Sequence, residues 1–176
     1  MKYSLSMRLL HWSMAAMIIG LLAVGLYMTG IPDDAPDKYD LYPAHKAFGF
    51  IVLMLILVRV ATRLRSQIPA LPDGLASWEQ KLSHAMHALL YLSMVAMAVS
   101  GYLMSSFYEY SHGIELFGLI TVPDITEKSE YWSGVFHLIH EIGGWVMIGA
   151  LGFHIAGVIK HRWLDAPEND VLGRMV

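Results

Sequence analysis

The sequence predicts an all-α integral membrane protein, a four-helix bundle with both termini on the inner side of the membrane. Two observations support this prediction. Hydrophobic residues make up 56% of the chain and charged residues only 15%, and the mean hydropathy is +0.48, so the chain is more apolar than an average soluble domain. Four apolar stretches are also long enough to cross about 30 Å of hydrocarbon, which takes about 20 helical residues. The 176 residues leave no room for a second module, and we expect a single membrane domain, 1–176.

The expected spans are roughly residues 9–28, 44–64, 78–107 and 134–160. The connection 30–43 contains prolines, which break helices, and carboxylates, which need water, and the connection 66–77 behaves similarly. The connection 108–133 is long enough to hold local structure, such as a short helix or a cap. A cleaved signal peptide is the rival interpretation of residues 1–29. It is disfavoured because the apolar run is longer than a usual signal core and no clear A-x-A site closes it.

The orientation follows from the distribution of lysine and arginine, which collect on the cytoplasmic side of membrane proteins. With four spans, nine of the 12 basic residues fall on the side of the termini, which predicts N-in and C-in. The three others would lie outside: Lys38, Lys46 and Lys128. The outer loops are otherwise rich in Asp and Glu, so we expect an acidic outer face.

Composition also excludes several classes of protein. The chain has no cysteine, which excludes disulfides, iron–sulfur clusters, zinc sites built on cysteine and covalently attached haem. Any cofactor must therefore be held by other ligands. A net charge of −3 gives no basic patch for nucleic acid, so DNA and RNA are not expected partners.

Nine histidines are unusual in so apolar a chain, because an ionisable ring inside hydrocarbon is costly and marks a functional site. His140 and His154 in the fourth span share one helical face to within about 40° but lie about 21 Å apart along the axis. They cannot bind one ion together. Two separate centres, one near each side of the bilayer, are therefore predicted.

Each centre needs a second ligand at the matching depth. His11 begins the first span on the inner side, like His154, and His45 begins the second span on the outer side, like His140. Two imidazoles from different helices suit the axial positions of a haem iron inside a bundle. A transition-metal site would more often recruit three or four converging ligands. The pattern therefore favours two bis-histidine haem b groups.

The remaining polar residues leave several roles open. A histidine near the inner side could hydrogen-bond a quinone carbonyl and carry its proton, or could replace an inner haem ligand. Next to His140, His137 is an alternative outer ligand, whereas His112 lies in a polar loop and is expected at the surface. The quinone-site candidates are His84, His87 and His161, and the candidates for pairing with haem propionates are Arg8, Lys46 and Arg59.

Several motifs together resemble the bacterial cytochrome b561 family over nearly the whole chain. They are His11-Trp12, AHKAFG at 44–49, LVRVATRLR at 57–65, HAMHALLYL at 84–92, and His140-Glu141 followed by His154 and His161. The resemblance implies a multi-pass protein of the bacterial inner membrane with two haems b. It also implies His11 with His154 as axial ligands of the inner haem and His45 with His140 as those of the outer one.

The resemblance further implies transfer of single electrons between the periplasmic side and the quinone pool, with ubiquinone or menaquinone as the partner inside the lipid. Some members of the family are superoxide oxidases, which pass electrons from superoxide to ubiquinone. Others are haem-bearing anchors of hydrogenases and dehydrogenases. An acidic outer face would repel superoxide unless the three outer lysines form a local positive patch, and it would suit a basic periplasmic redox protein such as a small c-type cytochrome. A haem-free transporter that uses histidines as a proton or metal relay is the remote alternative.

Overall fold

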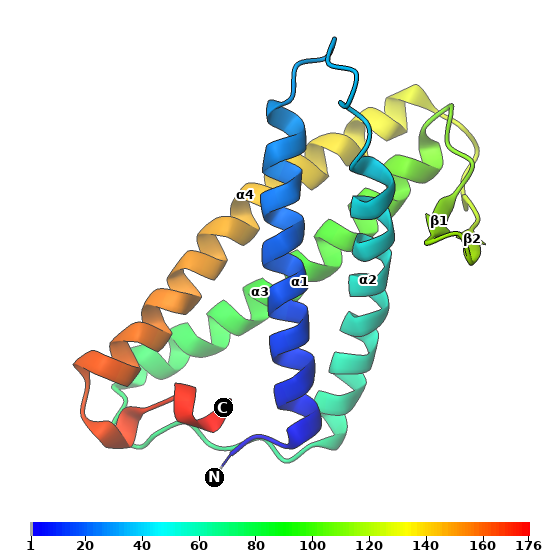
Figure 1. The fold of residues 1–176 in the computed structure, drawn as a ribbon. Coiled ribbons are helices and arrows are strands. Elements are labelled where there is room, and N and C mark those ends of the chain that lie inside the picture. Colours follow the sequence, from blue (N-terminus) through cyan, green and yellow to red (C-terminus); the bar gives the residue numbers. More distant parts are fainter. Residues whose placement is uncertain (1) are drawn as a thin grey trace.

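The computed structural model describes residues 2–176 and contains four long helices (Figure 1). All four are long and apolar enough to cross a membrane, which confirms the predicted all-α membrane bundle. Their bounds are Leu5–Gly30 for α1, Tyr42–Arg65 for α2, Ser77–Phe107 for α3 and Glu130–Ile159 for α4.

Two helices, α1 and α4, begin before the predicted apolar stretches, and each starts at a polar cap. The side chain of Ser4 accepts a hydrogen bond from the backbone of Met7 at the start of α1, and Ser129 does the same for Trp132 at the start of α4. Such caps satisfy backbone N–H groups that have no partner within the helix. Hydropathy alone misses these polar first turns. At its other end α4 continues into a π-helical turn, Lys160–Leu164, and two 3₁₀ turns follow, Pro167–Asn169 and Leu172–Arg174.

The helices pack in chain order, with α1 on α2, α2 on α3 and α3 on α4, and the α3–α4 contact is the most extensive. Small residues make this close approach possible. Gly143 of α4 packs against the side chain of Met97, and Ser100 of α3 and Ala150 of α4 are buried. Between membrane helices the apolar driving force is weak, so close packing of small residues carries much of the association.

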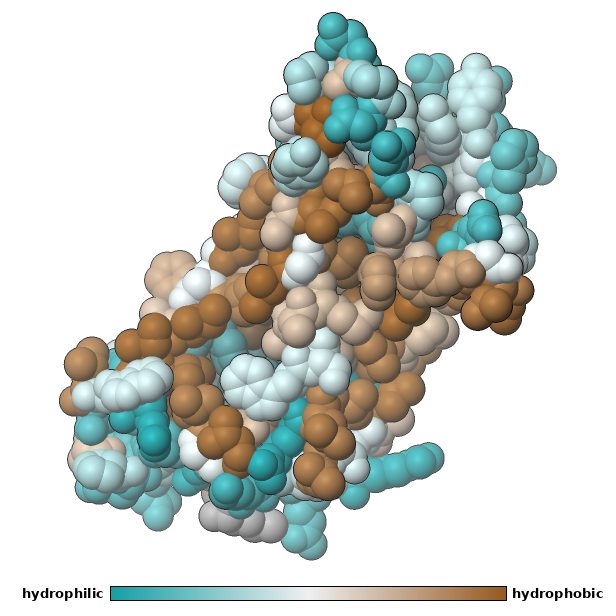
Figure 2. Space-filling model, viewed as in Figure 1, coloured by the Kyte–Doolittle hydropathy of each residue, from teal (hydrophilic) through white to brown (hydrophobic). Residues whose placement is uncertain are grey.

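Both termini lie at one end of the bundle, which we call the terminal end, at the bottom of Figure 1. It contains the α2–α3 loop and residues 160–176. The opposite end, which we call the hairpin end, contains the α1–α2 loop and residues 108–129. The face in Figure 2 is brown and apolar along the helices and teal and polar at both ends, as expected for a protein that spans a bilayer. Which end faces the cytoplasm stays a prediction from the lysine and arginine distribution.

The loop after α3 forms an antiparallel hairpin rather than a short helix. Its strands are β1, Ile114–Leu116, and β2, Ile120–Val122, with Glu115 opposite Thr121. Phe117 at the tip has φ of 54°, a region that non-glycine residues seldom adopt. Its ring packs edge-on against Phe48 of α2 with centroids 5.2 Å apart. This contact holds the hairpin beside the helix that carries His45.

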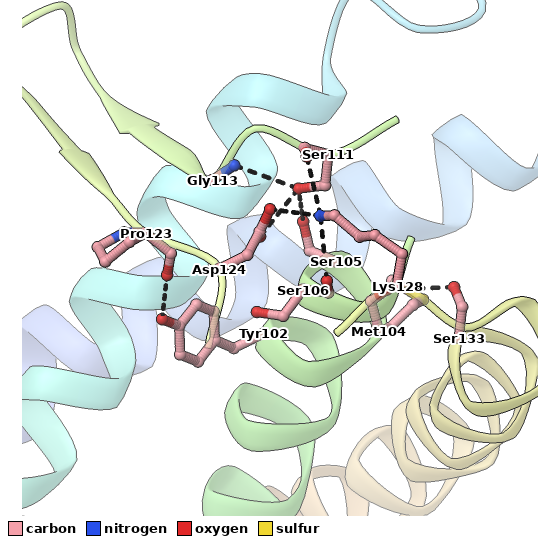
Figure 3. Close-up of polar contacts among 10 residues, drawn as sticks. All are labelled: Tyr102, Met104, Ser105, Ser106, Ser111, Gly113, Pro123, Asp124, Lys128 and Ser133. Atoms are coloured by element: carbon pink, nitrogen blue, oxygen red, sulfur yellow. Dashed lines mark hydrogen bonds and ion pairs between the residues drawn. The ribbon is translucent and has the colours of Figure 1, made fainter. Parts of the chain in front are cut away.

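A polar cluster fixes the same loop to the end of α3 (Figure 3). The ammonium of Lys128 donates to the backbone oxygens of Ser106 and Ser111 at 3.2 and 2.9 Å, and to Asp124 at 2.6 Å. Tyr102 donates its hydroxyl proton to the carbonyl oxygen of Pro123 at 2.6 Å. Since the cluster is built on the last turns of α3, the loop has a fixed position over the hairpin end.

An apolar core lies in the middle of the bundle. Met14 of α1 and Val52 and Ile56 of α2 are buried there, with Met94 and Ala98 of α3 packed against them. Along each helix these residues lie between the functional residues of the terminal end and those of the hairpin end. The core therefore separates two polar regions at different depths.

Candidate functional site

At the hairpin end, α2 and α4 bring two histidine rings close together in an edge-on arrangement. The ring centroids of His45 and His140 are 6.3 Å apart and their planes differ by 81°. Nδ1 of His140 lies 3.0 Å from the carbonyl oxygen of Met97 and 3.3 Å from the hydroxyl of Ser100. A carbonyl can only accept, so Nδ1 carries the proton and Nε2 keeps its lone pair, which is the tautomer of a metal ligand.

The surroundings of this pair contain one unsatisfied polar atom and two glycines that lie against the rings. Nδ1 of His45 is buried and has no hydrogen-bond partner within the described chain, an arrangement that costs free energy unless the ring meets a ligand. On α3, a Cβ at Gly101 would lie 3.0 Å from the ring of His140, and on α1 one at Gly25 would lie 3.5 Å from that of His45. All four helices therefore contribute to this site.

At the terminal end, α1 and α4 form a second pair with nearly the same spacing. The centroids of His11 and His154 are 6.4 Å apart and their planes differ by 66°. A third ring, His87 of α3, lies 5.4 Å from His154. These three histidines and Arg59 of α2 line a mainly apolar cavity of about 80 Å³.

The spacing within each pair can be compared with that of two ligands on one iron. The atoms of a five-membered ring with bonds of about 1.35 Å lie about 1.15 Å from its centre, and a metal–imidazole bond is about 2.0–2.1 Å, so two rings on opposite sides of one metal have centroids about 6.3–6.5 Å apart. The observed 6.3 and 6.4 Å fit this requirement. The 5.4 Å between His87 and His154 is too short. In the spacing of their rings, the two pairs thus fit two bis-histidine sites.

The other histidines occupy different positions. His87 donates from Nδ1 to the carbonyl oxygen of Ser83 at 2.7 Å, so its Nε2 can accept a proton. His84 makes the equivalent bond to Gln80 but is exposed and does not line the cavity. His137, the alternative to His140 as outer ligand, is exposed, as is His112 in the loop. In this structure it is His140 that faces His45.

His161, the third quinone-site candidate, belongs to a charged cluster outside the cavity. Nδ1 of His161 lies 2.6 Å from Asp165. The ammonium of Lys160 donates to Glu79 at 2.7 Å and to both oxygens of Asp165 at 2.8 and 2.9 Å. Glu79, His161 and Asp165 are close enough to hold a metal ion, but Lys160 already supplies the positive charge. The hydrogen bonds from Lys160, and to a lesser extent the one from His161, hold the pKa of the Asp165 carboxyl below its usual value.

Two of the three lysines predicted to lie on the outer side have local partners and form no positive patch. Lys38 donates to the carbonyl oxygen of Ile31 at 2.5 Å and pairs with Asp33 at 3.1 Å, and Lys128 pairs with Asp124. Exposed acidic side chains surround them on the loops of this end: Asp33, Asp34, Asp37, Asp40, Glu109, Glu115 and Glu127. The hairpin end is therefore acidic, with most of its lysine charge neutralised locally.

Two contributors to these sites have no distinctive sequence signal. Tyr91 accepts a hydrogen bond from Arg59 Nε at 3.1 Å, and the carbonyl of Met97 orients His140. Neither a tyrosine in an apolar helix nor a backbone carbonyl has a sequence pattern that shows whether it lies at a functional site. Gly101 stands out only as one of many glycines in the spans, and its proximity to His140 requires knowledge of how α3 and α4 pack.

Comparison with known proteins agrees with this architecture. The family model for prokaryotic cytochrome b561 matches residues 2–176. Cytochrome b561 homolog 2 of Escherichia coli is 25% identical over 175 residues, which cover 99% of this chain and 91% of that protein. Cytochrome b561 homolog 1 of the same organism is 21% identical, over 99% of this chain and 97% of that protein. The chain is thus a multi-pass bacterial membrane protein that belongs to the prokaryotic cytochrome b561 family.

Proposed function

We propose that this haem-bearing electron-transfer protein carries single electrons between its hairpin end, on the periplasmic side of the bacterial inner membrane, and the quinone pool. The observation that carries the proposal is the pair of histidine contacts, His45 with His140 and His11 with His154, at opposite ends of the bundle with ring centroids 6.3 and 6.4 Å apart. Each pair would hold one haem b. The haem iron supplies the one-electron change when bound, and the protein positions it and tunes its potential.

Charged side chains near each pair are the proposed partners of the haem propionates. At the terminal end, Nε of Arg8 is buried without a hydrogen-bond partner in the described residues, and Arg59 lines the cavity. Both are donors that an anionic group would satisfy. At the hairpin end, Lys46 follows His45 directly, and it feels the charges of Asp124 and Lys128.

His87 is the favoured contact for the quinone, either ubiquinone or menaquinone. Its Nδ1 proton is donated to the carbonyl oxygen of Ser83, so Nε2 keeps a lone pair that can accept a proton and, once protonated, can donate a hydrogen bond to a quinone carbonyl. His84 and His161 stay candidates for moving protons between this site and water. His161 belongs to the charged cluster around Lys160 at the same end of the bundle.

Superoxide is the first candidate electron donor. Two superoxide anions would each release one electron and become dioxygen, and one quinone would take up both electrons and two protons to become quinol. The test is to supply the purified, haem-loaded protein with superoxide and ubiquinone and to measure quinol. Quinol formation that depends on His140 supports the proposal. A protein with two b-type haems that gives no quinol above the uncatalysed rate would exclude this donor.

A second candidate donor is a basic redox protein, for which this chain would act as an electron-transfer subunit or membrane anchor. The observation that favours it is the acidic hairpin end, where Lys38 and Lys128 are paired with aspartates. Opposite charges speed the association of proteins and fix their orientation. The remote alternative, a haem-free transporter, is tested by a reduced-minus-oxidised visible spectrum. A preparation that stays colourless after reconstitution with haem would support the transporter and end the haem proposal.

A further inference from the structure

An arginine without a carboxylate partner lies inside the terminal-end site. Nη2 of Arg59 lies 3.0 Å from Nδ1 of His11, and the side chain lines the cavity shared with His87 and His154. The ion pairs of residues 2–176 do not include Arg59 or its neighbour Arg63. A charge within a membrane span is costly, and one kept without a counter-charge from the protein marks a function.

The hairpin-end site differs in its charge. There the ring of His140 is bound by neutral groups, the carbonyl of Met97 and the hydroxyl of Ser100. Two cations, Lys46 and Lys128, lie on this end, and Asp124 pairs with Lys128 at 2.6 Å. One site therefore holds a guanidinium 3.0 Å from a histidine of its pair, whereas the polar contacts of His140 at the other site are with neutral groups.

This asymmetry has a direct consequence for redox chemistry. Reducing a haem adds one negative charge, and a fixed cation in a medium of low dielectric constant stabilises that charge. We propose that Arg59 makes the terminal-end haem the more easily reduced of the two, so that electrons entering at the hairpin end run downhill toward the terminal end. The inference rests on the proposed function, because it requires a haem at each pair. The expected direction of the change in potential is the same if Arg59 pairs with a haem propionate. Removing the guanidinium would then leave the negative charge of that carboxylate unbalanced.

Tyr91 is the positioning residue for this charge. Arginine can only donate hydrogen bonds, and coordination through Nε2 of His11 puts the ring proton on Nδ1, so the guanidinium would have to leave that nitrogen. The bond from Arg59 Nε to the Tyr91 hydroxyl, 3.1 Å, does not depend on His11. The guanidinium also lies over the Tyr91 ring, 5.9 Å from its centroid, a cation–π contact that favours the same position.

Arg63 provides a matched control. Its guanidinium lies 5.8 Å from the same Tyr91 centroid, but it makes no hydrogen bond to His11 and does not line the cavity. It carries the same charge on the same helix, one turn closer to the end of α2. Replacing it removes a nearby positive charge without removing the one inside the site.

The experiment is a spectroscopic redox titration of the purified, haem-loaded protein and its variants. The His140→Ala variant, which should keep only the terminal-end haem, assigns the two midpoint potentials. At a fixed ambient potential, Arg59→Gln should lower the ferrous-to-ferric ratio of the terminal-end haem about tenfold and leave the other haem nearly unchanged. Arg59→Lys should keep most of the wild-type potential, Tyr91→Phe should give a smaller fall, and Arg63→Gln should have little effect.

Several outcomes would overturn the inference. They are a wild-type protein whose hairpin-end haem has the higher potential, an unchanged potential in Arg59→Gln, and a fall in Arg59→Lys as large as that in Arg59→Gln. If Arg59→Gln does not retain haem, the test uses Tyr91→Phe instead. An unchanged potential of the terminal-end haem in that variant would refute the inference. A wild-type protein without two b-type signals would instead refute the proposed function, so the two failures are distinguishable.

Discussion

Nδ1 of His140 lies 3.0 Å from the backbone oxygen of Met97, on the helix that packs against α4 most extensively. The residue one turn after Met97 is Gly101, and a side chain there would meet the ring of His140. Two features of α3, a carbonyl that accepts and a glycine that leaves room, therefore set both the tautomer and the position of this ring. Such outer contacts of a ligand commonly change metal affinity by about 10- to 100-fold.

Removal of one histidine of a pair should remove one haem and leave the other. His45→Ala or His140→Ala should reduce the content from two haems to one per chain and keep the terminal-end signal, because the other axial pair is built from separate residues. His11→Ala or His154→Ala should do the reverse. A pyridine haemochrome assay against protein concentration measures this, with His112→Ala as a control in the exposed loop. Two haems in His140→Ala would contradict the pairing. Loss of the hairpin-end haem in His137→Ala would show that His137, and not His140, is its ligand.

Gly101→Ala should weaken the hairpin-end haem site. The added Cβ would lie 3.0 Å from Cε1 of His140, so the ring must shift away from Met97, and the cost is about 1–3 kcal/mol for an overpacked interior. Haem titration into the apoprotein should show weaker binding at this site, and Gly101→Val should abolish it. Gly152→Ala is the matched control, because its Cβ has no neighbour within 4 Å. Equal haem affinity in the two alanine variants would show that Gly101 is not needed for space.

The cluster of Lys160, Asp165 and His161 should stabilise the fold at neutral pH and lose its effect in acid. The pKa of Asp165 is lowered in the folded state, first by Lys160, so its contribution is present above the unfolded pKa of about 4 and is lost as the pH falls through the folded pKa. Asp165→Asn should lower the melting temperature at pH 7 and have a smaller effect near pH 3. Thermal unfolding in detergent checks this, with exposed Asp73→Asn as control. A pH-independent difference would contradict the charge-based explanation.

Ionic strength should separate the two candidate donors. If the acidic hairpin end repels superoxide, added salt should speed quinone reduction, because it screens the repulsion. With a basic redox protein, salt should slow the reaction. The double replacement Asp34→Asn with Asp37→Asn removes two exposed carboxylates and should shift both rates in the same direction as salt does. Stopped-flow rates at several salt concentrations measure this, and rates independent of salt would exclude electrostatic control of entry.

The fold was largely predictable because membrane spans leave a strong signal in sequence. The four apolar stretches and the proline-rich connections placed the helices within a few residues, and the errors lie at polar first turns such as those capped by Ser4 and Ser129. The hairpin of β1 and β2 was not predicted. Three-residue strands are too short for a clear alternating pattern, and Phe117 at the tip is held by a contact with Phe48 that is remote in sequence.

The histidine pairs were predicted from depth and from the shared face of His140 and His154, and the resemblance implied the same pairs, which lie together in the structure. A helix rises about 1.5 Å per residue, so position along a span gives depth without any knowledge of packing. The rotation of each helix about its own axis within the bundle does not follow from position in this way. Whether His87 or His11 faces His154 at ligand spacing, and whether Arg59 contacts Tyr91, depend on how each helix is turned toward its neighbours.

The sequence by itself therefore determined the four spans, the two depths at which imidazoles gather, and the acidic character of the hairpin end, because hydropathy and charge are properties of single residues. Only the tertiary structure decided that Lys38 and Lys128 are neutralised by aspartates, that Met97 orients His140, and that an unpaired arginine lies beside His11. The contacts of His140 with Met97 and of His11 with Arg59 join residues far apart in the chain, and the local lysine–aspartate pairs depend on the conformation of their loops. The packing of side chains fixes these contacts, and that packing is not a property of any single residue.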